Sequence, residues 1–245
     1  MWSLRSGMSK KEPVSSGGLK KFRLMYKNSV LKILCDKNLR AVAGRELERN
    51  YSLLENYILE NPFFLSSYEP VDVDETAPNI VKIMTESTKK VGVGQMAAVA
   101  GAFSEVICDF LLGNGAKEVI VDNGGDICLN LRRERVIGVY AGTSAFSERI
   151  GFRITPDLGK IGICTSSSSV GHSVSLGDSD AVTVIADSCP LADAAATAIG
   201  NEVKGKQGIK NGIKRAKKIS GIEGVLIVID DEMGCWGNLP EIIRI

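Results

Sequence analysis

The order in which strand-like and helix-like segments follow one another most constrains the fold of this chain. Short runs of β-branched and aliphatic residues come in blocks, and about three long helical stretches interrupt them. The helical stretches lie near residues 47–58, 99–113 and 190–200, and the strand-like runs are 22–26, 30–34, 118–122, 127–131, 135–141, 149–154, 161–164, 181–186, 225–229 and 242–245. Because strands and helices do not alternate strictly, the sequence predicts an α+β fold.

The composition is that of an ordinary globular protein, long enough to bury a sizeable core. Of 245 residues, 44% are hydrophobic and 24% are charged. The 30 basic and 29 acidic side chains leave a net charge of +1, which gives no electrostatic case for nucleic acid as a partner. Residues 1–18, rich in Ser, Gly and Lys, are expected to form a flexible basic arm, and residues 19–245 a single domain.

Six cysteines occur without any C-x-x-C pair, which excludes a zinc knuckle or a thioredoxin-type motif. Most of their neighbours are apolar, which is typical of buried, reduced thiols. No stretch approaches the ~18 apolar residues of a membrane helix, and the N-terminus lacks the apolar core of a signal peptide. The sequence therefore indicates a cytoplasmic protein with no membrane partner, and it leaves a homo-oligomer open.

A hydroxyl-rich stretch at residues 165–173 contains the only histidine of the chain. Its hydroxyl groups and loop N–H groups are what a phosphate needs, because each phosphate oxygen requires several oriented donors. The candidate binding residues are Thr165, Ser166, Ser167 and Ser173, and His172 is the candidate catalytic acid or base beside them. The alternatives are a polar surface loop and a structural histidine.

Asp193 and Thr197 lie one turn apart in the helix that Pro190 begins. A carboxylate and a hydroxyl so arranged suit Mg²⁺, which binds few protein oxygens and keeps several waters. Both are therefore candidate metal ligands, and Asp193 is also a candidate catalytic residue, because a bound metal neutralises phosphate charge. The alternative is that Asp193 only interacts with the helix dipole in the first turn.

Residues 123–126, Asn-Gly-Gly-Asp, join two expected strands. Gly124 and Gly125, followed by Asp126, give a loop whose backbone can touch a planar ligand, so all three are candidate cofactor-binding residues. The alternative is an ordinary hairpin turn. The basic run 204–218 is most simply a solvated face, since its interior glycines weaken any helix there.

Taken in order, these segments resemble the ApbE-like proteins, the superfamily of FAD:protein FMN transferases, and are most similar to the cytoplasmic branch called UPF0280. The similarity runs through residues 99–101, 123–127, 164–167, 171–173, 182–186 and 192–198, and extends from about Phe22 to Gly237. The resemblance implies a T-fold-related α+β architecture with mixed sheets. It also implies a Mg²⁺ held by Asp193, Thr197 and the backbone carbonyl of Ala100, with FAD or FMN against residues 124–126. His172 matches the first residue of the family's H-I-I-D-P-x-T-G segment.

The chain departs from the family at two places. Residues 173–177 read Ser-Val-Ser-Leu-Gly, so the family's Asp-Pro-x-Thr-Gly is absent, and the lysine of its G-x-A-K-G segment is missing before Gly101. We therefore expect a Mg²⁺-dependent pocket for a phosphorylated ligand such as FAD or FMN, on a transferase or hydrolase of ApbE-like type if the protein is active. The alternatives are an enzyme of sulfur assimilation that contributes to homocysteine formation, and a non-catalytic binding module on the same scaffold.

Overall fold

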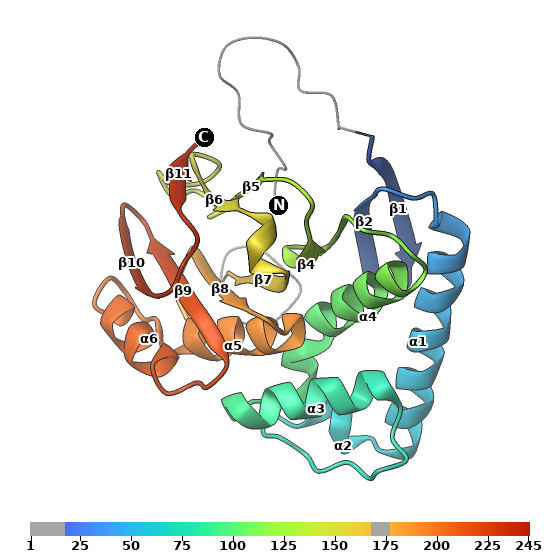
Figure 1. The fold of residues 1–245 in the computed structure, drawn as a ribbon. Helices are drawn as coiled ribbons and strands as arrows, with labels where there is room; N and C mark the ends of the chain where they lie inside the picture. Colours follow the sequence, from blue (N-terminus) through green and yellow to red (C-terminus); the bar gives the residue numbers. More distant parts are fainter. Residues whose placement is uncertain (1–17, 168–176) are drawn as a thin grey trace.

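An eight-stranded sheet forms the centre of the computed structural model, which describes residues 18–167 and 177–245 (Figure 1). Its strands follow the order β1-β2-β3-β4-β7-β8-β9-β10. Their bounds are β1 Lys20–Tyr26, β2 Ser29–Cys35, β3 Val119–Asn123, β4 Asp126–Asn130, β7 Lys160–Ser166, β8 Ala181–Ala186, β9 Ile222–Ile229 and β10 Glu232–Gly237. Every neighbouring pair is antiparallel, so the α+β class is confirmed while the expected mixed sheets are replaced by antiparallel ones. Residues 1–17 of the expected arm lie outside the described residues.

A second, three-stranded antiparallel sheet packs on one face of the large sheet (Figure 1). Its order is β11-β6-β5, with bounds β5 Arg135–Gly138, β6 Ile150–Ile154 and β11 Ile242–Arg244. Between the two sheets lies an apolar core, in which Ile137 and Phe152 of the small sheet meet Ile120 and Ile163 of the large one. The short η2 turn, Pro156–Leu158, connects β6 to β7.

The helices lie on the opposite face of the large sheet (Figure 1). They are α1 Arg40–Glu60, α2 Phe63–Ser66, α3 Asn79–Val91, the 3-10 turn η1 Gln95–Ala98, α4 Val99–Gly113, α5 Cys189–Glu202 and α6 Gly208–Ala216. Strand β3 shows how both faces are covered: Val119 and Val121 belong to the core under the helices, and Ile120 between them belongs to the core under the small sheet. A strand buried on both faces reads as a continuous apolar run, which is what the sequence shows here.

Helix α3 and strand β10 are among the elements that were not assigned from the sequence. In α3 the buried face mixes Ile80, Val81 and Met84 with hydroxyl residues, which hides its apolar periodicity. Thr88 is fully buried because its hydroxyl donates to the Met84 carbonyl oxygen at 2.9 Å, a bond made within the helix itself. Strand β10 is an edge strand with largely exposed residues and two glycines, so it lacks the apolar alternation of an inner strand.

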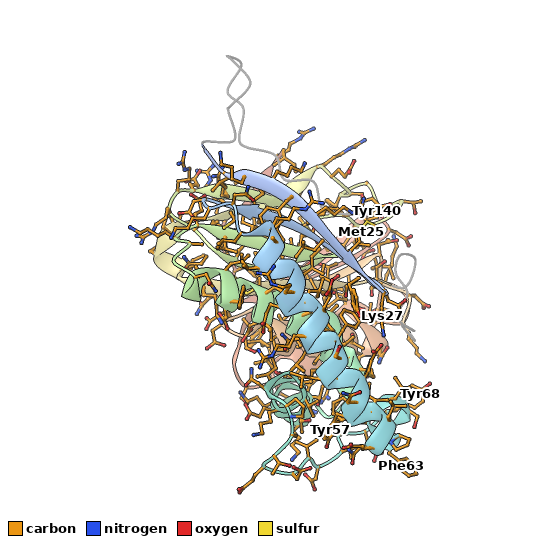
Figure 2. The ribbon with its side chains drawn as sticks, turned by 90° about the vertical axis from the view of Figure 1, so that its right-hand side faces the viewer. Met25, Lys27, Tyr57, Phe63, Tyr68 and Tyr140 are labelled. Carbon is orange, nitrogen blue, oxygen red and sulfur yellow. The ribbon has the colours of Figure 1, made fainter. Side chains whose placement is uncertain are left out.

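Helix α1 runs across the side of the molecule near β1 and β2, as Figure 2 shows. It buries Leu47 and Leu54, and Tyr57 packs edge-on against Phe64 of α2 with ring centroids 5.3 Å apart. Beyond it, Phe63 and Tyr68 project outwards, 78% and 83% exposed. Helix α1 stops at Glu60, shortly before Pro62, because the residue before a proline is sterically kept out of the helical region.

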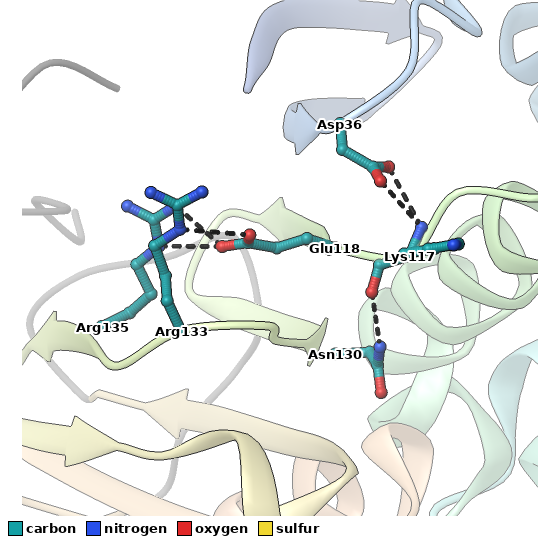
Figure 3. Close-up of polar contacts among 6 residues, drawn as sticks. All are labelled: Asp36, Lys117, Glu118, Asn130, Arg133 and Arg135. Atoms are coloured by element: carbon teal, nitrogen blue, oxygen red, sulfur yellow. Dashed lines mark hydrogen bonds and ion pairs between the residues drawn. The ribbon is translucent and has the colours of Figure 1, made fainter. Parts of the chain in front are cut away.

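The carboxylate of Glu118 ties the two sheets together (Figure 3). It is almost fully buried just before β3, and it accepts hydrogen bonds from Nε and Nη2 of Arg135 in β5 at 3.0 and 2.7 Å. Arg133 approaches the second oxygen at 3.6 Å. Next to it, the Lys117 N–H donates to Asp36 at 3.1 Å. A buried carboxylate is stable here because two guanidinium groups compensate its charge.

Within the part of the chain described, residues Gln95–Gly113 form the one helical stretch long and apolar enough to cross a membrane. This finding corrects the expectation that no stretch approaches the length of a membrane helix. In the fold it includes α4, whose Phe103, Ile107 and Leu111 belong to the core under the helices. Core helices meet the same criteria of length and hydropathy, so this stretch is weak evidence for a membrane span.

Candidate functional site

The turn between β3 and β4 is a two-residue hairpin built by its glycines. Asn123 and Asp126 are cross-strand partners, which leaves Gly124 and Gly125 as the turn, with φ of +74° and +113°. Positive φ at both central positions strongly favours glycine, so the sequence itself dictates this turn. The Gly125 N–H donates to Asp122 Oδ1 at 2.9 Å and so fixes the turn, while Gly124 stays exposed at its tip.

Helices α4 and α5 cap each other at a contact that we call the α4–α5 seam, formed by Gly101 and Glu105 of α4 and Cys189 and Asp193 of α5. The Gly101 N–H donates to Asp193 Oδ2 at 2.8 Å, and the Ala100 N–H also donates to this carboxylate. In return, the Cys189 N–H donates to Glu105 Oε2 at 2.6 Å. Each carboxylate thus satisfies N–H groups in the first turn of the other helix, where the helix dipole favours negative charge.

The seam depends on small residues, because the backbones come into contact there. A Cβ on Gly101 would lie 2.6 Å from the Cys189 carbonyl oxygen and 2.8 Å from the Asp193 Cβ. A Cβ on Gly162 of β7 would lie 2.4 Å from the Cys189 Cα. The first turn of α5 is therefore held between α4 and β7 with no space for a side chain on either neighbour.

Asp193 and Thr197 are the two half-buried residues in the otherwise buried run 189–200 of α5. They share one face of the helix, as the one-turn spacing predicted. Burial raises the pKa of the Asp193 carboxyl to about 7, although the N–H donors of Gly101 and Ala100 oppose this shift. Burial and then repulsion from Asp193 raise the pKa of Asp126 well above its usual range. Among the described residues neither carboxylate has an ion-pair partner.

The donor set at this place fits Mg²⁺. Two half-buried carboxylates repel one another and lack a basic partner in the described chain, so a divalent cation would remove an unfavourable charge. Within the same residues no group of three or more His, Cys, Asp or Glu side chains is arranged to hold a metal. A cation here would thus have few protein ligands, which is how Mg²⁺ is usually bound.

The carbonyl of Ala100, the third predicted metal ligand, belongs to the same peptide group as the Gly101 N–H. In a trans peptide these two groups point in opposite directions, and the N–H faces Asp193. The carbonyl oxygen instead accepts a hydrogen bond from Nδ2 of Asn123 at 3.3 Å. Its role as a metal ligand stays a prediction.

The predicted hydroxyl residues begin at the end of β7. Asp126 of β4 pairs with Cys164, so Thr165 and Ser166 follow directly beside the hairpin end. Thr165 Oγ1 lies 2.9 Å from Thr183 Oγ1 of β8, and residues 165–167 are half-buried. The predicted His172 and Ser173 lie in the segment 168–176, outside the described residues.

Sequence reasoning missed the residues behind the site. Glu105 lies in an apolar helix and Asn123 in a turn motif, and nothing in the neighbouring sequence indicates that they contact distant backbone groups.

Of the cysteines, Cys35, Cys108, Cys128, Cys164 and Cys189 are buried and only Cys235 is exposed, as expected for unpaired thiols. The Cys164 and Cys189 sulfur atoms lie 3.5 Å apart directly under the seam.

The raised pKa values predict a pH dependence of stability. Between about pH 4 and pH 7 the folded protein keeps protons on Asp193 and Asp126 that the unfolded chain has released, because the ordinary pKa of aspartate is about 3.9. The free energy of unfolding without Mg²⁺ therefore falls as the pH rises through this range. Asp193→Asn removes one of these groups, so the free energy of unfolding of this variant is expected to fall less steeply with pH. Urea denaturation of the wild type and of Asp193→Asn, at several pH values and in the presence of a chelator, measures this free energy. Equal slopes against pH in the two proteins would contradict the raised pKa of Asp193.

Known proteins similar to this chain include archaeal relatives and a solved structure. A protein-family model described as AbpE bacteria matches residues 12–228. A UPF0280 protein of Methanocaldococcus jannaschii is 43% identical over 230 residues, which cover 92% of this chain and 93% of the relative. A UPF0280 protein of Methanococcus maripaludis is 48% identical over 195 residues, covering 78% and 79%. The apo flavinyl transferase ApbE of Pseudomonas stutzeri has a TM-score of 0.56 at 15% identity, covering 89% of this chain and 94% of that one, which is a likeness of fold.

Proposed function

Because the chain belongs to the UPF0280 family of ApbE-like proteins, we propose that it is a cytoplasmic protein that binds a phosphorylated flavin, FAD or FMN, together with Mg²⁺. The observation that carries the proposal is the pair of half-buried carboxylates, Asp193 and Asp126, which lack a basic partner in the described chain. Asp193 and Thr197 would hold the Mg²⁺. The cation would neutralise the negative charge of the phosphate groups.

The surrounding residues supply what a flavin phosphate needs. At the tip of the turn, Gly124 presents exposed backbone with no side chain, so a planar ring can approach it closely. Thr165, Ser166 and Ser167 contribute hydroxyl groups that donate to phosphate oxygens. His172 and Ser173 would complete this set from the segment that follows, with His172 moving a proton.

The likeness of fold to the flavinyl transferase ApbE supports the choice of ligand, because the name of that protein describes an enzyme that transfers a flavin. Transfer of the flavin to another protein is a separate question from flavin binding. The missing lysine before Gly101 and the missing Asp-Pro-x-Thr-Gly after His172 remove parts that the family uses. We therefore expect weak or absent transfer of FMN to a threonine-bearing acceptor peptide.

A titration with FAD, with and without Mg²⁺, tests the proposal. We expect Mg²⁺ to tighten FAD binding by about 10-fold or more, since a cation on a phosphate contributes several kcal/mol of charge stabilisation. Riboflavin has the ring but no phosphate, so its binding should not depend on Mg²⁺. ADP has the diphosphate but no flavin ring, so it should show the Mg²⁺ effect with weaker binding. Flavin fluorescence anisotropy and, for ADP, calorimetry measure these affinities.

The same titration separates the alternatives. Absence of flavin binding under all conditions would contradict the proposal and favour the enzyme of sulfur assimilation or the non-catalytic module. Flavin binding that ignores Mg²⁺ would contradict the metal part alone. In-gel flavin fluorescence on an acceptor peptide, after incubation with FAD and Mg²⁺, would show that the family's transfer reaction survives the two departures.

A further inference from the structure

A row of hydrogen bonds connects helix α1 to the carboxylate of Asp193. The hydroxyl of Tyr51 in α1 donates to Ser29 Oγ at the start of β2, at 2.6 Å. The side-chain amide Nδ2 of Asn123, at the end of β3, donates to Ser29 Oγ at 3.4 Å and to the Ala100 carbonyl oxygen at 3.3 Å. The next group in the row is the peptide between Ala100 and Gly101, whose N–H donates to Asp193 Oδ2 at 2.8 Å.

The start of this row is rigid. The Tyr51 ring stacks on Phe103 of α4 with centroids 4.3 Å apart, and it meets Tyr26 of β1 edge-on at 5.2 Å. Two ring contacts leave the hydroxyl little freedom, so Ser29 is held in one position. Asn123 is itself buried, 8% exposed, at a strand end whose cross-strand partners are Leu31 and Asp126.

The peptide group is held from both ends. Its carbonyl accepts from Asn123 and its N–H donates to Asp193, and these two groups point in opposite directions. A rotation of the peptide plane that breaks one bond therefore weakens the other. A donor on the carbonyl also polarises the peptide and strengthens its N–H as a donor.

We propose that Asn123, held by Ser29 and Tyr51, is a positioning residue for Asp193: it fixes the Ala100–Gly101 peptide so that its N–H faces the carboxylate. The inference rests on the proposed function, in which Asp193 holds Mg²⁺. An N–H that faces Oδ2 holds the carboxylate in one orientation, and a metal ligand held in one orientation binds its cation more tightly. Loss of the amide of Asn123 therefore weakens Mg²⁺ binding, and the pH dependence of that binding, which moves to higher pH when the N–H no longer faces the carboxylate, is a second readout.

The experiment uses the full chain and Mg²⁺ alone, titrated by calorimetry at several pH values. Asn123→Leu keeps the size of the side chain and removes the donor, and we expect about a 10- to 100-fold loss of Mg²⁺ affinity, the usual effect of losing a partner behind a metal ligand. Tyr51→Phe removes one hydroxyl and should shift affinity and pH midpoint in the same direction, by less. Tyr57→Phe is the matched control, because Tyr57 lies in the same helix and its hydroxyl makes no hydrogen bond in the described part of the chain.

Stability without Mg²⁺ is measured in parallel, and if Asn123→Leu does not fold, Ser29→Ala replaces it as the variant that loosens Asn123. Lower affinity with a raised pH midpoint in Asn123→Leu and Tyr51→Phe, but not in Tyr57→Phe, supports the inference. If Asn123→Leu and Tyr51→Phe have the same Mg²⁺ affinity and pH midpoint as Tyr57→Phe, while Asp193→Asn abolishes Mg²⁺ binding, the inference is overturned. If Asp193→Asn itself binds Mg²⁺ like the wild type, the proposed function is wrong and this inference is overturned with it.

Discussion

Replacing Gly101 with alanine is expected to destabilise the protein by about 1–3 kcal/mol, the usual cost of forcing an extra methyl group into a packed region. The new Cβ would lie 2.6 Å from the carbonyl oxygen of Cys189 and 2.8 Å from the Cβ of Asp193. Neither atom is the free end of a flexible side chain, and Cys189 is also held from the other side at Gly162. The α4–α5 seam must therefore open, which lengthens the hydrogen bond from the Gly101 N–H to Asp193.

Urea denaturation and Mg²⁺ titration of the variant measure both consequences. Gly113→Ala is the matched control, since it lies in the same helix and its Cβ would meet no atom within 4 Å. Alanine is the better helix former by roughly 0.5–1 kcal/mol in a helix interior, so this control should be neutral or slightly stabilising. If Gly101→Ala were as stable as Gly113→Ala, the close approach of α4 and α5 at the seam would be wrong.

Asp193→Asn is expected to abolish the effect of Mg²⁺ on FAD binding, with a loss of Mg²⁺ affinity of at least about 100-fold, the upper end of what loss of a partner behind a metal ligand costs. The amide oxygen can still accept from the Gly101 N–H, so the cap on α4 is retained while the negative charge is lost. The substitution thus separates the two roles of this side chain. A purely structural cap would leave Mg²⁺ binding unchanged.

The control for this prediction is Asp187→Asn, which removes an exposed carboxylate shortly before α5. It should bind Mg²⁺ and FAD like the wild type, because a surface charge of this kind contributes little. Thermal melts with and without Mg²⁺ complete the comparison. A Mg²⁺-dependent rise in melting temperature that persists in Asp193→Asn would contradict the assignment of Asp193 as a ligand.

The local features of the site could be predicted from the sequence because each is decided by neighbouring residues. The hairpin at residues 123–126 follows from two glycines that accept positive φ. The common face of Asp193 and Thr197 follows from the period of the α-helix, and the start of α5 follows from Pro190. These predictions need no knowledge of the rest of the chain.

The contacts that join these features could not be predicted, because they depend on which elements pack together. Nothing in residues 99–113 indicates that Glu105 accepts a hydrogen bond from the Cys189 N–H, 84 positions away. The partner of Asn123 is a main-chain carbonyl, and main-chain groups carry no signature in the sequence. The seam also explains the small residues where α4 and α5 meet, because the two backbones come into contact there.

The long distance in sequence between α4 and α5 has a consequence for how the protein folds during its synthesis. In the large sheet each strand pairs with the next one in sequence, apart from the detour through β5 and β6 between β4 and β7, and the pairs β1–β2, β3–β4 and β9–β10 close short loops at little entropic cost. The α4–α5 seam instead joins Gly101 to a residue 92 positions later. A nascent chain that has not yet emerged from the ribosome as far as Asp193 has α4 without its cap and no candidate site. The site is thus completed only after about four fifths of the chain has been synthesised.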